Sequence, residues 1–178
     1  ILTMVGSRDY FDKEIDGNFN VTLAHRQPGS AFKPLVYAEA FVKGYTPETI
    51  VFDVKTQFSS TCAPDNLSNV SPCYAPDDYD GQFRGPITLR DSLAQSINIT
   101  SVKTLYLAGI KDSINLAKNF GIESLGDANQ YGLTLVLGGG EVTLLEITSA
   151  YSVFANEGVR NPYTGILEVK DKNDIVLE

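Results

Sequence analysis

Ser30 and Lys33 are the two residues whose types and spacing could best carry out catalysis. A serine hydroxyl is a weak nucleophile unless a proton acceptor lies within hydrogen-bond reach of it. Residues three positions apart share one face of a helix, so Lys33 can be that acceptor for Ser30. Burial and nearby positive charge would lower the pKa of Lys33 toward that of a usable base. The Ser-x-x-Lys spacing therefore predicts nucleophilic catalysis by a serine with a lysine base.

A helix over residues 31–42 is expected to position this pair. Pro28-Gly29 interrupts any preceding element, and Gly44 closes the apolar run that follows. The positive end of the helix dipole would stabilise charge developing on Ser30 Oγ. The alternative is that Ser30 caps the helix and Lys33 is solvated, because a chain of this length should contain on the order of one Ser-x-x-Lys by chance.

A second polar triplet, Ser96-Ile97-Asn98, falls in a short break between two helical patterns. Ser-x-x-Lys with a Ser-Asp-Asn element and Lys-Thr-Gly is the signature of penicillin-binding proteins and class A β-lactamases. Here the middle residue is Ile97 instead of Asp, which fits the broader Ser-x-Asn form. The alternative for Ser96 and Asn98 is that their side chains only satisfy backbone groups at a helix junction.

Further segments in the same order extend this similarity over nearly the whole chain. With them, the chain closely resembles the transpeptidase domain of the bifunctional, class A penicillin-binding proteins, which cross-link bacterial peptidoglycan. The segments are Met4 to Tyr10, Gly44 to Pro47, Tyr74 to Pro76, Tyr79 to Gly81, Arg84 to Arg90, Leu137 to Thr143, Thr148 to Tyr151 and Phe154 to Gly158.

The resemblance implies an α+β penicillin-binding protein and serine β-lactamase-like transpeptidase fold, in which helices flank an antiparallel sheet. Residues 1–178 would form the N-terminal and central part of one such domain. Ser30 would attack the penultimate D-Ala carbonyl of a stem peptide ending in D-Ala-D-Ala, and Lys33 would take its proton. Ser96 would relay a proton to the leaving amine, and Asn98 would hold the substrate amide and orient Lys33. β-lactam antibiotics would acylate the same serine, and no cofactor or metal is implied.

The family's third motif, Lys-Thr/Ser-Gly, is missing from this sequence. None of the lysines after Ser96 is followed by Thr or Ser and then Gly; they are Lys103, Lys111, Lys118, Lys170 and Lys172. We therefore expect the C-terminal strands of the domain to lie outside this chain, with a separate chain as one way of supplying them. On that expectation, the 178-residue chain by itself would be inactive. A membrane anchor and a glycosyltransferase half would also lie outside it, on a protein at the extracytoplasmic face of the bacterial membrane.

Two other functions remain open at this stage. One is a catalytically inactive or penicillin-sensing module of the same fold. The other is a serine β-lactamase, in which a glutamate acting through water deacylates the enzyme. The sequence shows no glutamate in a convincing equivalent setting.

Composition narrows the class of partner. The net charge of −8 argues against a nucleic-acid surface, and 43% hydrophobic with 20% charged residues is typical of globular proteins.

Cys62 and Cys73 are the only cysteines, and an extracytoplasmic setting favours a disulfide between them, with two free thiols as the alternative. Two cysteines and the single histidine, His25, make a poor metal site. A Ser-His-Asp triad would have to use His25, which we expect at the surface.

The remaining pattern predicts the other elements. Phe52 to Arg84 should be a long irregular excursion, in which scattered aromatic residues (Phe52, Phe58, Tyr74 and Tyr79) pin the loop rather than line a cleft. Strands are expected at Ile1 to Val5 and Asn18 to Ala24, and helices near 90–95, with Thr88 as the N-cap, 99–107 and 111–120. A capping box at Thr143 should open a further helix that forms the buried spine of the domain, and residues 165–178 should form a hairpin.

Overall fold

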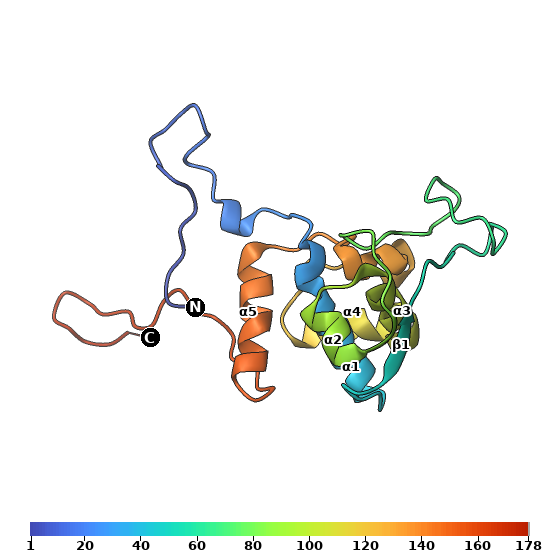
Figure 1. The fold of residues 1–178 in the computed structure, drawn as a ribbon. Helices are drawn as coiled ribbons and strands as arrows, with labels where there is room; N and C mark the ends of the chain where they lie inside the picture. Colours follow the sequence, from blue (N-terminus) through green and yellow to red (C-terminus); the bar gives the residue numbers. More distant parts are fainter. Residues whose placement is uncertain (178) are drawn as a thin grey trace.

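The computed structural model describes residues 1–177, and helix α1 (Lys33–Val42) stands at its centre (Figure 1). Helices α3 (Asn98–Ala108) and α4 (Ile110–Asn119) pack against it. The other elements are α2 (Leu89–Ala94), α5 (Leu144–Ala155), strands β1 (Ile50–Asp53) and β2 (Gly85–Thr88), and 3₁₀ helices at Val21–Leu23, Gly29–Phe32, Ala128–Gln130 and Leu133–Leu137.

Strands β1 and β2 form a short antiparallel sheet in which Val51 lies opposite Ile87 and Asp53 opposite Gly85. Val51 and Asp53 point inward, whereas Ile50 and Phe52 are exposed, as the alternation of a strand requires. Both strands were missed by the sequence pattern, which placed Phe52 in the irregular excursion. Strand β1 has only four residues, and one of its two buried positions is an aspartate, so the alternation of apolar and polar residues is too short to indicate a strand. The expected α+β class, helices with an antiparallel sheet, is confirmed.

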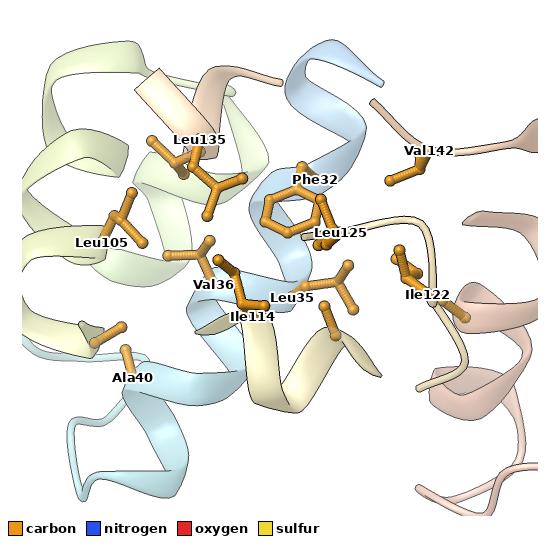
Figure 2. Close-up of a cluster of buried hydrophobic side chains, with 14 of the residues drawn as sticks. Phe32, Leu35, Val36, Ala40, Leu105, Ile114, Ile122, Leu125, Leu135 and Val142 are labelled. Carbon is orange, nitrogen blue, oxygen red and sulfur yellow. The ribbon is translucent and has the colours of Figure 1, made fainter. Parts of the chain in front are cut away.

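The main core surrounds α1 (Figure 2). Leu35, Val36 and Ala40 on α1 meet Leu105 on α3 and Ile114 on α4, and all five are at most 2% exposed. Burying a large aliphatic side chain contributes about 1.5–3 kcal/mol, so this cluster fixes α1 and the turn that precedes it.

A second, smaller cluster fixes the turn before α3. Ile97 is 3% exposed and packs with Tyr37, Val51 and Leu89. The hydroxyl of Tyr37 is hydrogen-bonded to Ser92 Oγ at 2.7 Å. Because Ile97 stands between Ser96 and Asn98, its burial anchors both polar neighbours.

The prediction of two strands near the N-terminus is wrong. Within the described residues no strand pairs with residues 1–5, and Asn18 to Ala24 instead contains the 3₁₀ helix Val21–Leu23. Asn20 caps that helix, since its Oδ1 accepts the Thr22 amide at 3.0 Å. A strand needs a neighbouring strand to satisfy its backbone, whereas a 3₁₀ turn and a capping side chain satisfy theirs locally.

The capping box at Thr143 is confirmed, because the side chains of Thr143 and Glu146 each accept the other's backbone amide. The expectation that this helix is the buried spine is wrong. On α5 only Ser149, Ala150 and Val153 are buried, whereas Leu144 and Phe154 are 53% and 43% exposed. One stripe of α5 faces the core and α1 holds the central position instead.

The other predicted helices agree with α2, α3 and α4 to within two residues, and Thr88 caps α2 as expected. The predicted hairpin is present as a single bridge between Lys170 and Val176, and Glu178 lies outside the described residues.

The long loop between β1 and β2 is held in two ways. A disulfide joins Cys62 and Cys73, as the expected compartment favoured. Phe58 and Tyr74 pack against the main core, so the pinning role is confirmed for them. Phe52 and Tyr79 are 59% and 100% exposed, so that role is wrong for these two aromatic residues.

The core at α1 should dominate stability. We predict that Leu35→Ala lowers the free energy of unfolding by about 2–5 kcal/mol, because it removes a fully buried side chain and leaves a cavity. Leu167→Ala is the matched control, since Leu167 is 91% exposed and its loss should change stability by less than about 0.5 kcal/mol. Urea denaturation measures both, and equal effects would contradict this assignment of the core.

Candidate active site

Ser30 and Lys33 occupy the junction between the 3₁₀ helix Gly29–Phe32 and α1. The Lys33 amide donates to the Ser30 carbonyl, so the two residues stand one turn apart on a continuous helical path. Gly29 has φ 58°, a left-handed conformation that favours glycine. A Cβ on Gly138 would lie 2.2 Å from the Gly29 amide nitrogen, so only a glycine allows the Gly138 loop to approach this turn.

The Lys33 ammonium is buried, with the residue 1% exposed, and every close partner comes from the triplet before α3. Lys33 Nζ lies 2.6 Å from the Ser96 carbonyl, 3.1 Å from Ser96 Oγ, 2.9 Å from Asn98 Oδ1 and 3.3 Å from the Ile97 carbonyl. Four acceptors surround a group with three N–H donors. The structure thus brings Lys33, Ser96 and Asn98 together.

The triplet is held in a shape that suits this contact. Ser96 adopts φ 55°, and Asn98 opens α3. Asn98 Nδ2 donates to the Asp77 carbonyl at 3.0 Å, which orients Asn98 Oδ1 toward Lys33. Asn98 is therefore fixed at both ends of its amide.

Asp78 completes the site from the loop between β1 and β2. Its Oδ1 accepts the amides of Asn98 at 2.7 Å and Ile99 at 3.1 Å, so it caps α3 from a distant segment. Sequence reasoning did not assign this role. The cap joins residues twenty positions apart, so no local spacing could have indicated it.

Burial lowers the pKa of Lys33 to about 8, and the nearby charge of Asp78 opposes that shift. The reason is that removing an ammonium from water disfavours its charged form. Lys33 can therefore lose its proton at a pH far below that of an ordinary lysine.

Ser30 differs from its neighbour in being exposed. Within residues 1–177 its Oγ makes no hydrogen bond, so the structure does not show the Ser30–Lys33 hydrogen bond that the spacing predicts. Tyr151 on α5 donates to the Ala31 carbonyl at 2.8 Å and braces the turn that carries Ser30. An exposed hydroxyl at the start of a helix is accessible to a large substrate.

His25 is exposed, as expected. In the part of the chain that the structure describes, no group of three or more His, Cys, Asp or Glu side chains could hold a metal ion. No helix among the described residues has the length and apolar character that a membrane span requires.

The family model of the penicillin binding protein transpeptidase domain matches residues 1–175. The chain belongs to this family. Penicillin-binding protein 1A of Rickettsia bellii is 36% identical over 177 residues, which cover 99% of this chain and 21% of that protein. Penicillin-binding protein 2D of Bacillus subtilis is 35% identical over 178 residues, which cover 99% and 24%. This penicillin-binding protein transpeptidase chain thus spans about a fifth to a quarter of the length of these relatives.

Solved structures show the same transpeptidase fold. The crystal structure of penicillin-binding protein 1A from Haemophilus influenzae matches with a TM-score of 0.75 at 29% identity, over 92% of this chain and 23% of that one. PonA1 from Mycobacterium tuberculosis in complex with penicillin V matches with a TM-score of 0.73 at 20% identity, over 90% and 43%. The second likeness concerns the fold alone.

The lowered pKa of Lys33 has a consequence for stability that can be measured. The unfolded lysine titrates near 10.5 and the folded one near 8, so between these values the unfolded state binds more protons and stability rises with pH. We predict that Lys33→Met removes roughly 1–3 kcal/mol of this rise between about pH 7 and pH 10. The exposed Lys111→Met is the control and should keep the rise. An unchanged pH dependence in Lys33→Met would rule out the shifted lysine.

Proposed function

We propose that the complete protein is a D,D-transpeptidase that cross-links peptidoglycan stem peptides through an acyl-enzyme on Ser30. The observation that carries this proposal is the buried Lys33 ammonium, hydrogen-bonded to Ser96 and Asn98 and one helical turn from an exposed serine. Family membership agrees with it. Ser30, Lys33, Ser96 and Asn98 are the proposed catalytic residues.

The proposed reaction has two halves. Ser30 Oγ bonds to the carbonyl carbon of the penultimate D-Ala while its proton passes to Lys33. The peptide bond to the terminal D-Ala then breaks, and Ser96 relays a proton from Lys33 to the leaving amine. An amine from a second stem peptide then attacks the ester carbonyl carbon. A new amide forms as the bond to Ser30 Oγ breaks, and a proton from the attacking amine passes to Ser30 Oγ and restores its hydroxyl.

Each remaining group has a role in this scheme. The Ser30 amide at the helix start supplies half of the oxyanion site, where an N–H stabilises the developing negative charge. Asn98 binds the substrate amide and orients Lys33. A lysine with a pKa of about 8 is matched to both accepting and returning a proton near neutral pH.

β-lactams are the second proposed ligand class, and they would acylate Ser30. PonA1 of M. tuberculosis has been solved with penicillin V, and penicillin-binding protein A of the same organism as an imipenem acyl-enzyme at 18% identity to this chain. We place the protein at the extracytoplasmic face of the bacterial membrane, and the Cys62–Cys73 disulfide fits an oxidising compartment. The third motif would come from a segment outside this chain.

An inactive penicillin-sensing module of the same fold is the other candidate. It shares the fold and the Ser30 position, so labelling alone does not separate the two. Turnover does: a transpeptidase transfers the acyl group to an amine, and a sensor keeps it.

Ser30 should be the residue that penicillin modifies. We expect a fluorescent penicillin to label the complete protein covalently and Ser30→Ala to abolish labelling, because no other hydroxyl stands one turn before Lys33 on this helix. His25→Ala is the control and should label normally, since His25 lies outside the proposed mechanism. Loss of labelling in a folded His25→Ala protein would favour a histidine base.

The rate of acylation should depend on pH through Lys33. The second-order rate constant for penicillin reports the ionisation of the free enzyme, so it should rise about tenfold per pH unit below about pH 8 and level off above it. Stopped-flow measurement of the label tests this. A rate that is flat from about pH 6 to pH 9 would exclude Lys33 as the base.

A further inference from the structure

Two buried carboxyl groups, Asp53 and Asp78, lie beside the site without enough donors for their oxygens. Asp53 on β1 is 0% exposed, and Asp78 is 5% exposed. Asp53 Oδ1 and Asp78 Oδ2 are both buried, and neither has a hydrogen-bond partner among the described N–H and O–H donors. Buried polar atoms are almost always paired, so two unpaired oxygens on two neighbouring acids call for an explanation.

The other oxygen of each carboxyl group already accepts at least one backbone amide. Asp53 Oδ2 accepts the Arg84 amide at 2.8 Å. Asp78 Oδ1 accepts the amides of Asn98 and Ile99 at the start of α3. Asp78 is the neighbouring side chain whose hydrogen bonding and charge raise the pKa of Asp53. Two ionised carboxylates have only acceptors and cannot bond, whereas one proton between them satisfies both free oxygens.

We propose that Asp53 is held as a neutral carboxylic acid whose Oδ1–H donates to Asp78 Oδ2, and that this pair positions Asn98 and sets the negative charge facing Lys33. The inference rests on the proposed function for its catalytic consequence only. Asp53 touches no proposed catalytic residue, so it is a positioning residue that acts through Asp78.

The charged groups around the pair are compatible with one negative charge rather than two. Lys33 on α1 faces Asp78, and Lys103 on α3 faces Asp53. The guanidinium of Arg84 is 3.7 Å from Asp53 Oδ2 but 2.7 Å from Asp80 Oδ2, so its charge is mainly matched by Asp80. Burial raises the pKa of Asp53, and the bond with Asp78 adds to that rise while the Arg84 amide opposes it.

The consequence for the site follows from geometry. The Asp53 proton fixes one side of the Asp78 carboxyl group while the other side caps α3, so Asp78 connects the sheet to the first residue of that helix. A second full charge at Asp53 would repel Asp78, weaken this cap and raise the proton affinity of Lys33. The neutral acid thus keeps Asn98 in place and Lys33 usable as a base.

Asp53→Asn tests the proposal, because its amide Nδ2 replaces the O–H donor permanently and its Oδ1 still accepts the Arg84 amide. In the wild type, the folded Asp53 keeps a proton that the unfolded Asp53 loses above its ordinary pKa of 3.8. The stability of the wild type therefore falls as pH rises from that value through the higher pKa of the folded Asp53. The measured quantity is the melting temperature of Asp53→Asn minus that of the wild type, both in the complete protein. We expect this difference to increase by about 2 °C or more between about pH 4 and pH 8.

The opposite sign would overturn the proposal. If Asp53 is an ionised partner of Arg84, Asp53→Asn lowers the melting temperature most at about pH 8 and least at about pH 4. A difference that does not vary with pH also overturns it. Asp77→Asn is the matched control, since Asp77 is adjacent to Asp78. Its side chain is 63% exposed and forms an ion pair with Lys55. It should leave the pH dependence of melting unchanged.

Penicillin acylation supplies the readout for the positioning role. Asp53→Asn should keep the acylation rate to within about threefold, whereas Asp53→Ala should lower it by about tenfold or more, because it leaves Asp78 and the Arg84 amide unpaired. Asp78→Asn should shift the pH profile to lower pH, because the Asp78 charge raises the pKa of Lys33. Equal rates for Asp53→Ala and the wild type, or an unshifted profile in Asp78→Asn, would refute the role. Persistent labelling of Ser30→Ala would instead refute the proposed function, and the melting result would stand unaffected.

Discussion

The buried ammonium of Lys33 joins α1 to the turn that opens α3. A charge removed from water is costly unless oxygens surround it, and here they come from residues 63 to 65 positions later in the chain. Satisfying one ammonium therefore fixes α1, the Ser96 turn and the start of α3 relative to one another. The same burial that makes the contact obligatory lowers the pKa of Lys33, so the structural requirement and the chemistry have one origin.

Apolar packing holds this polar contact in register from two sides. Leu35 and Val36 seat α1 in the main core, and Ile97 seats the triplet in the smaller cluster against Tyr37. The side chains of Ser96 and Asn98 alternate with a buried isoleucine, so their direction is set by a hydrophobic residue between them. This arrangement leaves the hydroxyl of Ser30 exposed while the Lys33 ammonium is buried.

The charged groups that affect Lys33 extend beyond the four proposed catalytic residues. Asp78 connects the long loop to α3 and faces Lys33, and in the proposed pair Asp53 connects the sheet to Asp78. The short sheet, which sequence patterns missed, thus has a part in the site because one of its inward positions is an aspartate instead of an aliphatic residue.

Features that depend on neighbours in the chain could be predicted from the amino-acid sequence. Ser30 and Lys33 on one turn, the Thr88 and Thr143 caps, and the helices that follow all depend on residues within four positions of each other. Motif order also indicated the family and the proposed site residues. Tertiary structure alone decided what depends on partners far along the chain: that residues 1–5 pair with no strand among the described residues, that α1 and not α5 is central, and that Asp78 caps α3 beside Asp53. Strand pairing, burial and the pairing of buried charges are properties of neighbours in space, which a spacing along the chain does not specify.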